Sequence, residues 1–120
     1  MKIRIKGNSM RYRLTKSEVQ TFCETGFFKE TTDFGTRTFT YAIATGEGEE
    51  LLQATFEDAT ITLFLNEKER LGWADSAQVG FRHTMPLGDG RELTLLLEKD
   101  FVCMDESVED QTDNYPNPRA

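Results

Sequence analysis

The chain has 120 residues and a net charge of −7, with 38% hydrophobic and 29% charged residues. A chain of this length can remove roughly two thirds of its unfolded surface from water, so one domain with one core is feasible without metal or disulfide support. The overall acidity argues against a nucleic-acid partner, and the absence of an apolar run of about 20 residues or a signal-peptide h-region predicts a cytoplasmic protein without a membrane partner.

The N-terminal quarter predicts two short strands followed by a helix. Residues 2–6 and 10–14 alternate basic and apolar side chains around the turn residues 7–9. Thr15 and Glu18 then form a capping-box pattern, and Gly26 is a suitable C-terminal stop. We therefore expect a helix over about 16–25, with Cys23 on its apolar stripe.

From residue 27 onward the apolar side chains recur at every second position, which is typical of strands. Asn66 and Glu69 predict a brief second helix over 67–73, and Trp73 is expected to close one end of the core. No internal repeat is evident. The apolar sets are Phe28/Phe34, Phe39/Tyr41/Ile43, Leu52/Ala54/Phe56, Ile61/Leu63/Leu65, Val79/Phe81/Met85 and Leu93/Leu95/Leu97.

These patterns predict an α+β fold that is mainly antiparallel β. We expect about eight strands in a small barrel or strongly curved sheet, rather than a sandwich of two large sheets, with one N-terminal helix. Residues 1–101 form the globular domain in this interpretation. Residues 102–120 lack an apolar period and predict an extended or partly disordered acidic tail, pinned by Tyr115 and the prolines.

Both ends of the chain carry recognisable sequence blocks. Residues 1–19 match a KIRIKGNSxRxRLTxSEV-like block, and residues 98–118 match an EKDFxC…YPNP-like block. On these blocks the chain resembles a small family of uncharacterised bacterial proteins, a domain of unknown function. The resemblance implies a compact single domain and supplies no catalytic residues.

A basic face is the first candidate site. It comprises Arg4, Lys6, Arg11 and Arg13, joined by Lys2 and Arg37 if another strand lies beside them. If these side chains pointed into a barrel, they would line an anion-binding lumen, because guanidinium groups pair with phosphate or carboxylate in bidentate fashion. The alternative is a solvated sheet face that balances part of the acidic surface.

The second candidate is a metal site formed by His83, Cys103 and Asp105. Thiolate, imidazole and carboxylate ligands suit zinc, but no local spacing ties two of them to one element. A hydrogen-bonded core or rim histidine and an apolar packing role for Cys103 are the competing interpretations. A nucleophilic pair of Cys103 and His83 is disfavoured by the acidic neighbours of the cysteine. A disulfide between Cys23 and Cys103 is not favoured in a cytosolic chain.

The charge distribution suggests an intramolecular contact. Residues 1–40 carry eight Lys/Arg and four Asp/Glu, whereas residues 98–113 carry seven Asp/Glu and one Lys. The acidic segment is a solvating tail or folds back over the basic N-terminal strands. It lacks the ligand spacing of a calcium-binding loop.

The function predicted from the sequence is a binding or interaction module whose partner is an unidentified protein or a small anionic ligand. No nucleophile–base pair, phosphate-binding loop or metal quartet is recognisable, so an enzyme is disfavoured and no cofactor is implied. The alternative is an enzyme or sensor for a phosphorylated or otherwise anionic small molecule held by the basic strands. The sequence leaves the oligomeric state open.

Overall fold

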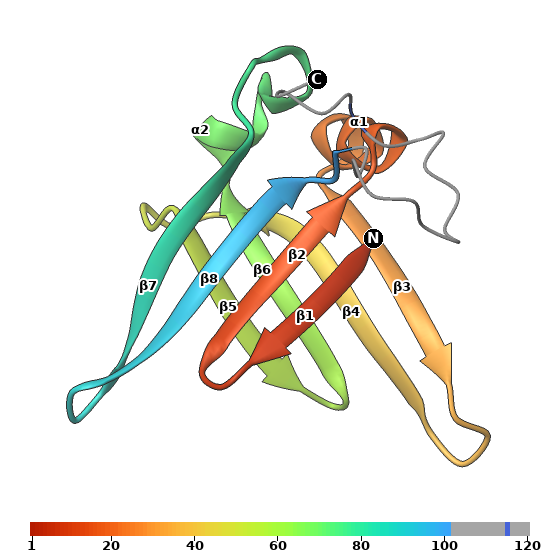
Figure 1. Cartoon of the computed structure of the whole chain (residues 1–120), viewed down its shortest axis with the longest axis vertical. Coiled ribbons are helices and arrows are strands. Elements are labelled where there is room, and N and C mark those ends of the chain that lie inside the picture. Colours follow the sequence, from red (N-terminus) through yellow and green to blue (C-terminus); the bar gives the residue numbers. More distant parts are fainter. Residues whose placement is uncertain (102–114, 116–120) are drawn as a thin grey trace.

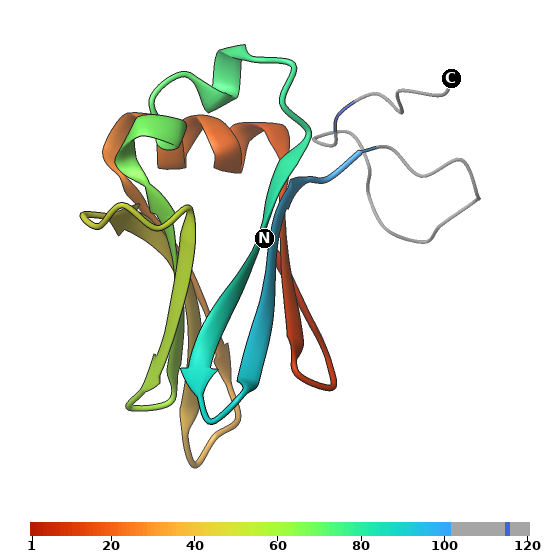
Figure 2. The same ribbon diagram turned by 90° about the vertical axis from the view of Figure 1, so that its left-hand side faces the viewer.

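Two four-stranded sheets face each other, with the helices across one end and the four hairpin turns at the other (Figures 1 and 2). The computed structural model describes residues 1–101 and Tyr115. Sheet A has the order β1-β2-β8-β7 and sheet B the order β3-β4-β6-β5. In chain order the elements are β1 (Lys2–Lys6), β2 (Ser9–Leu14), α1 (Lys16–Thr25), β3 (Phe27–Asp33), β4 (Thr38–Gly46), β5 (Leu52–Glu57), β6 (Thr60–Asn66), α2 (Glu67–Arg70), a 3₁₀ turn η1 (Trp73–Asp75), β7 (Gly80–Gly88) and β8 (Arg91–Lys99).

The sheets correct the predicted architecture. The described residues form no closed barrel, and β2–β8 and β4–β6 are parallel pairs at the centre of each sheet. Four hairpins supply the remaining, antiparallel pairs. The fold is therefore mainly β, but it consists of two mixed sheets. Parallel neighbours cannot be joined by a tight turn. The connection from β4 to β6 runs through β5 of the same sheet, whereas the connection from β2 to β8 runs through sheet B and returns with β7.

The two halves of the chain have the same topology, although no repeat was recognised in the sequence. The first half is β1-β2-α1-β3-β4, the second is β5-β6-α2-β7-β8, and each half contributes one hairpin to each sheet. Thr94 N–H donates to the Asn8 carbonyl at 3.1 Å, and at the equivalent place Thr40 N–H donates to the Ala59 carbonyl at 3.0 Å. The halves are thus related by an approximate two-fold rotation that exchanges the sheets.

Both helices begin where the sequence predicts. At α1, Glu18 Oε1 accepts a hydrogen bond from Thr15 N–H at 2.8 Å, and Gly26 ends the helix with a φ of 82°. At the equivalent position in the second half, Asn66 Oδ1 accepts from Lys68 N–H at 2.8 Å. The second helix is interrupted after α2, and η1 carries the buried Trp73.

The core lies between the sheets and under the helices. Its largest fully buried side chains are Trp73, Tyr12, Phe22, Leu14, Ile43, Leu52, Leu63, Leu65, Leu95, Leu97 and Val19. Tyr12 of sheet A donates its hydroxyl to the Ile61 carbonyl of sheet B at 3.1 Å, which satisfies the buried oxygen and joins the sheets. Burial raises the pKa of Tyr12 above its usual range.

Trp73 occupies the place predicted for it. Its ring packs 5.3 Å from the Phe81 ring between centroids, and its Nε1 donates to the Gln78 carbonyl at 3.0 Å. Because the indole is buried and its one polar atom is satisfied, it closes the helix-covered end of the core.

Candidate functional site

The cations of the N-terminal strands lie on the outer face of sheet A. On β2, Met10, Tyr12 and Leu14 are buried, so the alternate residues point away from the core. The strand registers then form three rows across the sheet: Lys6–Ser9–Thr94–Thr84, Arg4–Arg11–Leu96–Arg82 and Lys2–Arg13–Glu98–Gly80. We call the six cations in these rows the basic face.

This placement corrects the lumen hypothesis. With no closed barrel among the described residues, and with the cations outside the core, these side chains do not line an internal tunnel. Arg37 does not join them, since it lies in the turn between β3 and β4 of sheet B. Arg82 of β7 takes a place in the central row instead, which the sequence analysis missed.

The basic face is only partly neutralised. Arg11 Nε and Arg13 Nε lie 3.1 and 3.5 Å from the same oxygen, Oε1 of Glu98. Arg4 and Lys6 are exposed and form no ion pair with any residue in the described part of the chain. The Glu98 carboxylate therefore pairs with both arginines of β2, and the charges of at least Arg4 and Lys6 remain in solvent.

The equivalent positions on sheet B provide an internal comparison. The approximate two-fold rotation places Gln53, Thr55 and Glu57 of β5 where β1 has Lys2, Arg4 and Lys6. It places Thr62 and Phe64 of β6 where β2 has its two arginines. Since one topology folds with both sets, strand formation does not require the cations of the basic face.

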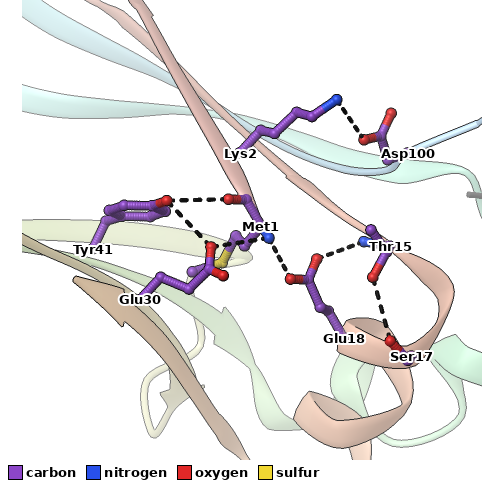
Figure 3. Close-up of polar contacts among 8 residues, drawn as sticks. All are labelled: Met1, Lys2, Thr15, Ser17, Glu18, Glu30, Tyr41 and Asp100. Atoms are coloured by element: carbon purple, nitrogen blue, oxygen red, sulfur yellow. Dashed lines mark hydrogen bonds and ion pairs between the residues drawn. The ribbon is translucent and has the colours of Figure 1, made fainter. Parts of the chain in front are cut away.

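A second polar cluster surrounds the N-terminal ammonium group (Figure 3). The Met1 nitrogen is buried, forms an ion pair with Glu18 Oε2, and lies 3.0 Å from Glu30 Oε2. The Tyr41 hydroxyl lies 3.2 Å from both the Met1 carbonyl oxygen and Glu30 Oε2, and burial, followed by the Glu30 charge, raises the pKa of Tyr41. These contacts join β1, α1, β3 and β4, so the cluster has a structural role.

Beside this cluster, Lys2 Nζ lies 3.4 Å from Oδ2 of the buried Asp100 (Figure 3). The Asp100 main-chain N–H donates to the Leu14 carbonyl at 2.9 Å. These two contacts hold the residue that follows β8 beside the start of β1 and the end of β2.

The predicted metal site is not assembled by the described residues. His83 Nε2 lies 3.2 Å from Glu50 Oε2, which agrees with a hydrogen-bonded rim position. No group of three metal-ligating His, Cys, Asp or Glu side chains occurs in residues 1–101. Cys103 and Asp105 lie outside the described residues, as does the pairing of Cys103 with His83, so these remain predictions.

A pocket of about 360 Å³ lies between α1 and η1, lined in part by Cys23, Asp75 and Tyr115. Cys23 is a free thiol that packs against the core, and burial raises its pKa. Because the thiolate is the reactive form, this environment does not favour a nucleophile.

Tyr115 is held against the end of β8. Its main-chain N–H donates to the Asp100 carbonyl at 2.8 Å, and its ring lies 5.7 Å from that of Phe101 between centroids. Lys99 Nζ lies 5.0 Å from the Tyr115 ring centroid and donates to the Ser76 carbonyl at 2.8 Å. Burial lowers the pKa of Lys99, and the electrostatic interaction with Cys23 partly offsets this effect.

The molecule is thus a two-sheet protein with an internal topological repeat and a charged outer face on one sheet. A family model, described as a family of unknown function (DUF7009), matches residues 1–119, and the chain belongs to this family. Neither the curated proteins nor the solved structures contain a match. Among the described residues, none of the helices combines the length and apolarity needed to cross a membrane.

Proposed function

We propose that this protein is a non-enzymatic binding module whose basic face binds an extended acidic polypeptide. The observation that carries the proposal is the difference between the two sheets. Positions that bear Lys2, Arg4, Lys6, Arg11 and Arg13 on sheet A bear no cation at their equivalents on sheet B. A charge pattern that folding does not require is better explained by a partner.

The dimensions of the face suit a polypeptide. Neighbouring strands lie about 4.8 Å apart and alternate residues along a strand about 6.8 Å apart, so the cations form a grid with the spacing of side chains on an extended chain. β1 is also an edge strand of sheet A, with no strand beyond it among the described residues. An acidic strand added there would place its outward carboxylates beside Arg4 and Lys6.

The composition of the face favours acidic polypeptides over nucleic acid. The central row contains Leu96 rather than an aromatic side chain that could stack on a base. The neighbouring row contains Thr84 and Thr94, whose hydroxyls can donate to carboxylates.

Fluorescence anisotropy with a labelled oligoglutamate tests the proposal. We expect saturable binding that weakens with salt, and a loss of roughly 1.5- to 5-fold in affinity for each cation removed by Arg4→Gln or Arg82→Gln. Lys29→Gln is the matched control, because Lys29 is the equivalent of Arg82 on sheet B. Equal losses in the control, or tighter binding of an oligothymidylate of the same charge, would contradict the proposal.

The acidic segment of the chain itself is a competitor for the same face. Asp105, Glu106, Glu109, Asp110 and Asp113 lie outside the described residues, so the fold-back contact remains a prediction. Replacing these five carboxylates by amides in the full chain is expected to increase oligoglutamate affinity at low salt. An unchanged affinity would refute the predicted fold-back contact but would not affect the proposal that the basic face binds an acidic partner.

A further inference from the structure

The open end of the molecule, opposite the helices, contains two adjoining pockets: the first lies between the sheets, and the second lies between the ends of the two hairpins of sheet B. One has a volume of about 380 Å³ and the other about 480 Å³, and Phe39 and Phe56 line both. Volumes of this size fall in the range of small-molecule sites. The pockets are separate from the basic face, whose side chains point out of the opposite surface of sheet A.

The first pocket lies across the approximate two-fold axis. Its lining contains three pairs of equivalent residues, and in each pair one member comes from each sheet. The pairs are Ile5 with Phe56, Met10 with Ile61, and Leu93 with Phe39. One wall is therefore aliphatic apart from a thioether, and the facing wall carries two aromatic rings.

The apolar side chains at this end are incompletely covered. Phe56 is 69% exposed, Phe34 in the second pocket is 68% exposed, and Ile5 is 60% exposed. A gathered set of large exposed apolar side chains is unusual on a monomer and marks a binding surface. Met10 and Ile61, which also line the first pocket, are buried. An occupant that contacts them therefore has to enter between the sheets.

The charges of the pockets specify the polar end of the occupant. Among the described residues, Arg37 is the only charged side chain that lines either pocket, and no carboxylate of this part of the chain lines them. Arg37 forms no ion pair with another described residue. In a chain with 21 Asp and Glu residues, a carboxylate-free apolar pocket with one arginine at its side is complementary to an apolar anion.

We propose that the open end binds a small amphipathic anion, with its apolar body between the aromatic and aliphatic walls and its carboxylate or sulfonate at Arg37. A planar body suits the site, since the two aromatic side chains, Phe39 and Phe56, both belong to the wall from sheet B. A neutral apolar molecule makes the same wall contacts but loses the ion pair, and a cationic one is repelled.

Two dyes with the same arylaminonaphthalene body test this proposal on the full chain. Anilinonaphthalene sulfonate is anionic, whereas N-phenyl-1-naphthylamine is neutral. We expect saturable fluorescence enhancement with the anionic dye, its displacement by decanoate, and little displacement by decyltrimethylammonium.

Variants then separate the two parts of the site. Arg37→Gln is expected to lower the affinity for the anionic dye roughly tenfold and to leave the affinity for the neutral dye unchanged. Phe56→Ser is expected to weaken both dyes roughly tenfold. The controls are Lys29→Gln and Phe27→Ser, which remove an exposed cation and a 48% exposed phenylalanine from the outer face of sheet B.

Three results would overturn the proposal: dye binding that does not saturate, equal losses in the control variants, or an Arg37→Gln effect of the same size on both dyes. Sedimentation of the dye-free protein tests the other possible occupant of this end, a second copy of the chain. If the chain is a dimer that Phe56→Ser converts to a monomer, a second copy covers this end and the small-molecule site is refuted.

Discussion

The ammonium group of Met1 offers the sharpest test of the packing. Glu18 contacts it with Oε2 while its Oε1 accepts from Thr15 N–H at 2.8 Å, so one carboxylate both caps α1 and compensates a buried cation. Glu18→Gln keeps an acceptor for the cap and removes the charge. Glu30→Gln removes the second carboxylate, whose oxygen lies 3.0 Å from the same nitrogen.

The expected losses follow from burial. Glu18 is 13% exposed and Glu30 is 37% exposed, so Glu18→Gln should lower the free energy of unfolding by about 1–2 kcal/mol and Glu30→Gln by about 0.5–1 kcal/mol. The double variant leaves the buried ammonium group without a carboxylate, and the cost should reach about 3–5 kcal/mol. The losses are therefore more than additive, because each single variant retains one partner.

Urea denaturation followed by circular dichroism measures these free energies, provided that the transition is two-state. Glu18→Ala supplies a further comparison, since it removes the cap as well and should cost about 1 kcal/mol more than Glu18→Gln. A double variant whose loss equals the sum of two small single losses would refute the argument, because the ammonium group would then be solvated.

Three further predictions concern the packing and stability of the fold. Gly80→Ala should destabilise the fold by about 1–3 kcal/mol, because an added Cβ would lie 2.3 Å from the Leu97 carbonyl oxygen, whereas Gly48→Ala meets open space and should be nearly neutral in urea denaturation. Tyr12→Phe should cost about 1 kcal/mol in the same assay through the lost inter-sheet hydrogen bond, and a neutral result would contradict that bond. In a Cys103→Ser background, iodoacetamide should alkylate Cys23 with a pH midpoint above that of the urea-unfolded chain, since burial raises the thiol pKa in the folded state alone; equal midpoints would show that the thiol is solvated.

Local signals in the sequence identified the elements well. The Thr15 and Glu18 pair together with Gly26 placed α1, and the period-two apolar pattern located the strands, because capping and burial depend on neighbouring residues. Tyr115, expected to pin the C-terminal segment, does contact the end of β8. These features need no knowledge of which strands pair.

The short turns predicted the antiparallel hairpins, but the pairing of one hairpin with another was missed. The parallel partners β2 and β8 lie at opposite ends of the chain, and an apolar alternation specifies which side of a strand is buried but not its neighbour. The repeat was hidden for a related reason. Equivalent inward positions such as Ile5 and Phe56 are both apolar, but the outward positions of β1 and β2 carry cations where β5 and β6 carry none, so a residue-by-residue comparison of the two halves finds little identity.

The candidate sites were likewise predicted only where they depend on local sequence and not on strand pairing. The sequence located the alternating cations but not their direction or Arg82, whose place depends on the pairing of β7 with β8. The contact between His83 and Glu50 depends on loop geometry outside any motif. The open-end pockets bring together Arg37, Phe39 and Phe56 from two hairpins, and their only sequence signal was an excess of phenylalanine near turns.

An NMR titration of the full chain with oligoglutamate tests the central claim, the binding role of the basic face, most directly. We expect amide shift changes to concentrate on β1, β2, β8 and β7, and to shrink when Arg4 and Arg82 are replaced by glutamine. Shift changes concentrated on the outer face of sheet B, or none at low salt, would contradict it.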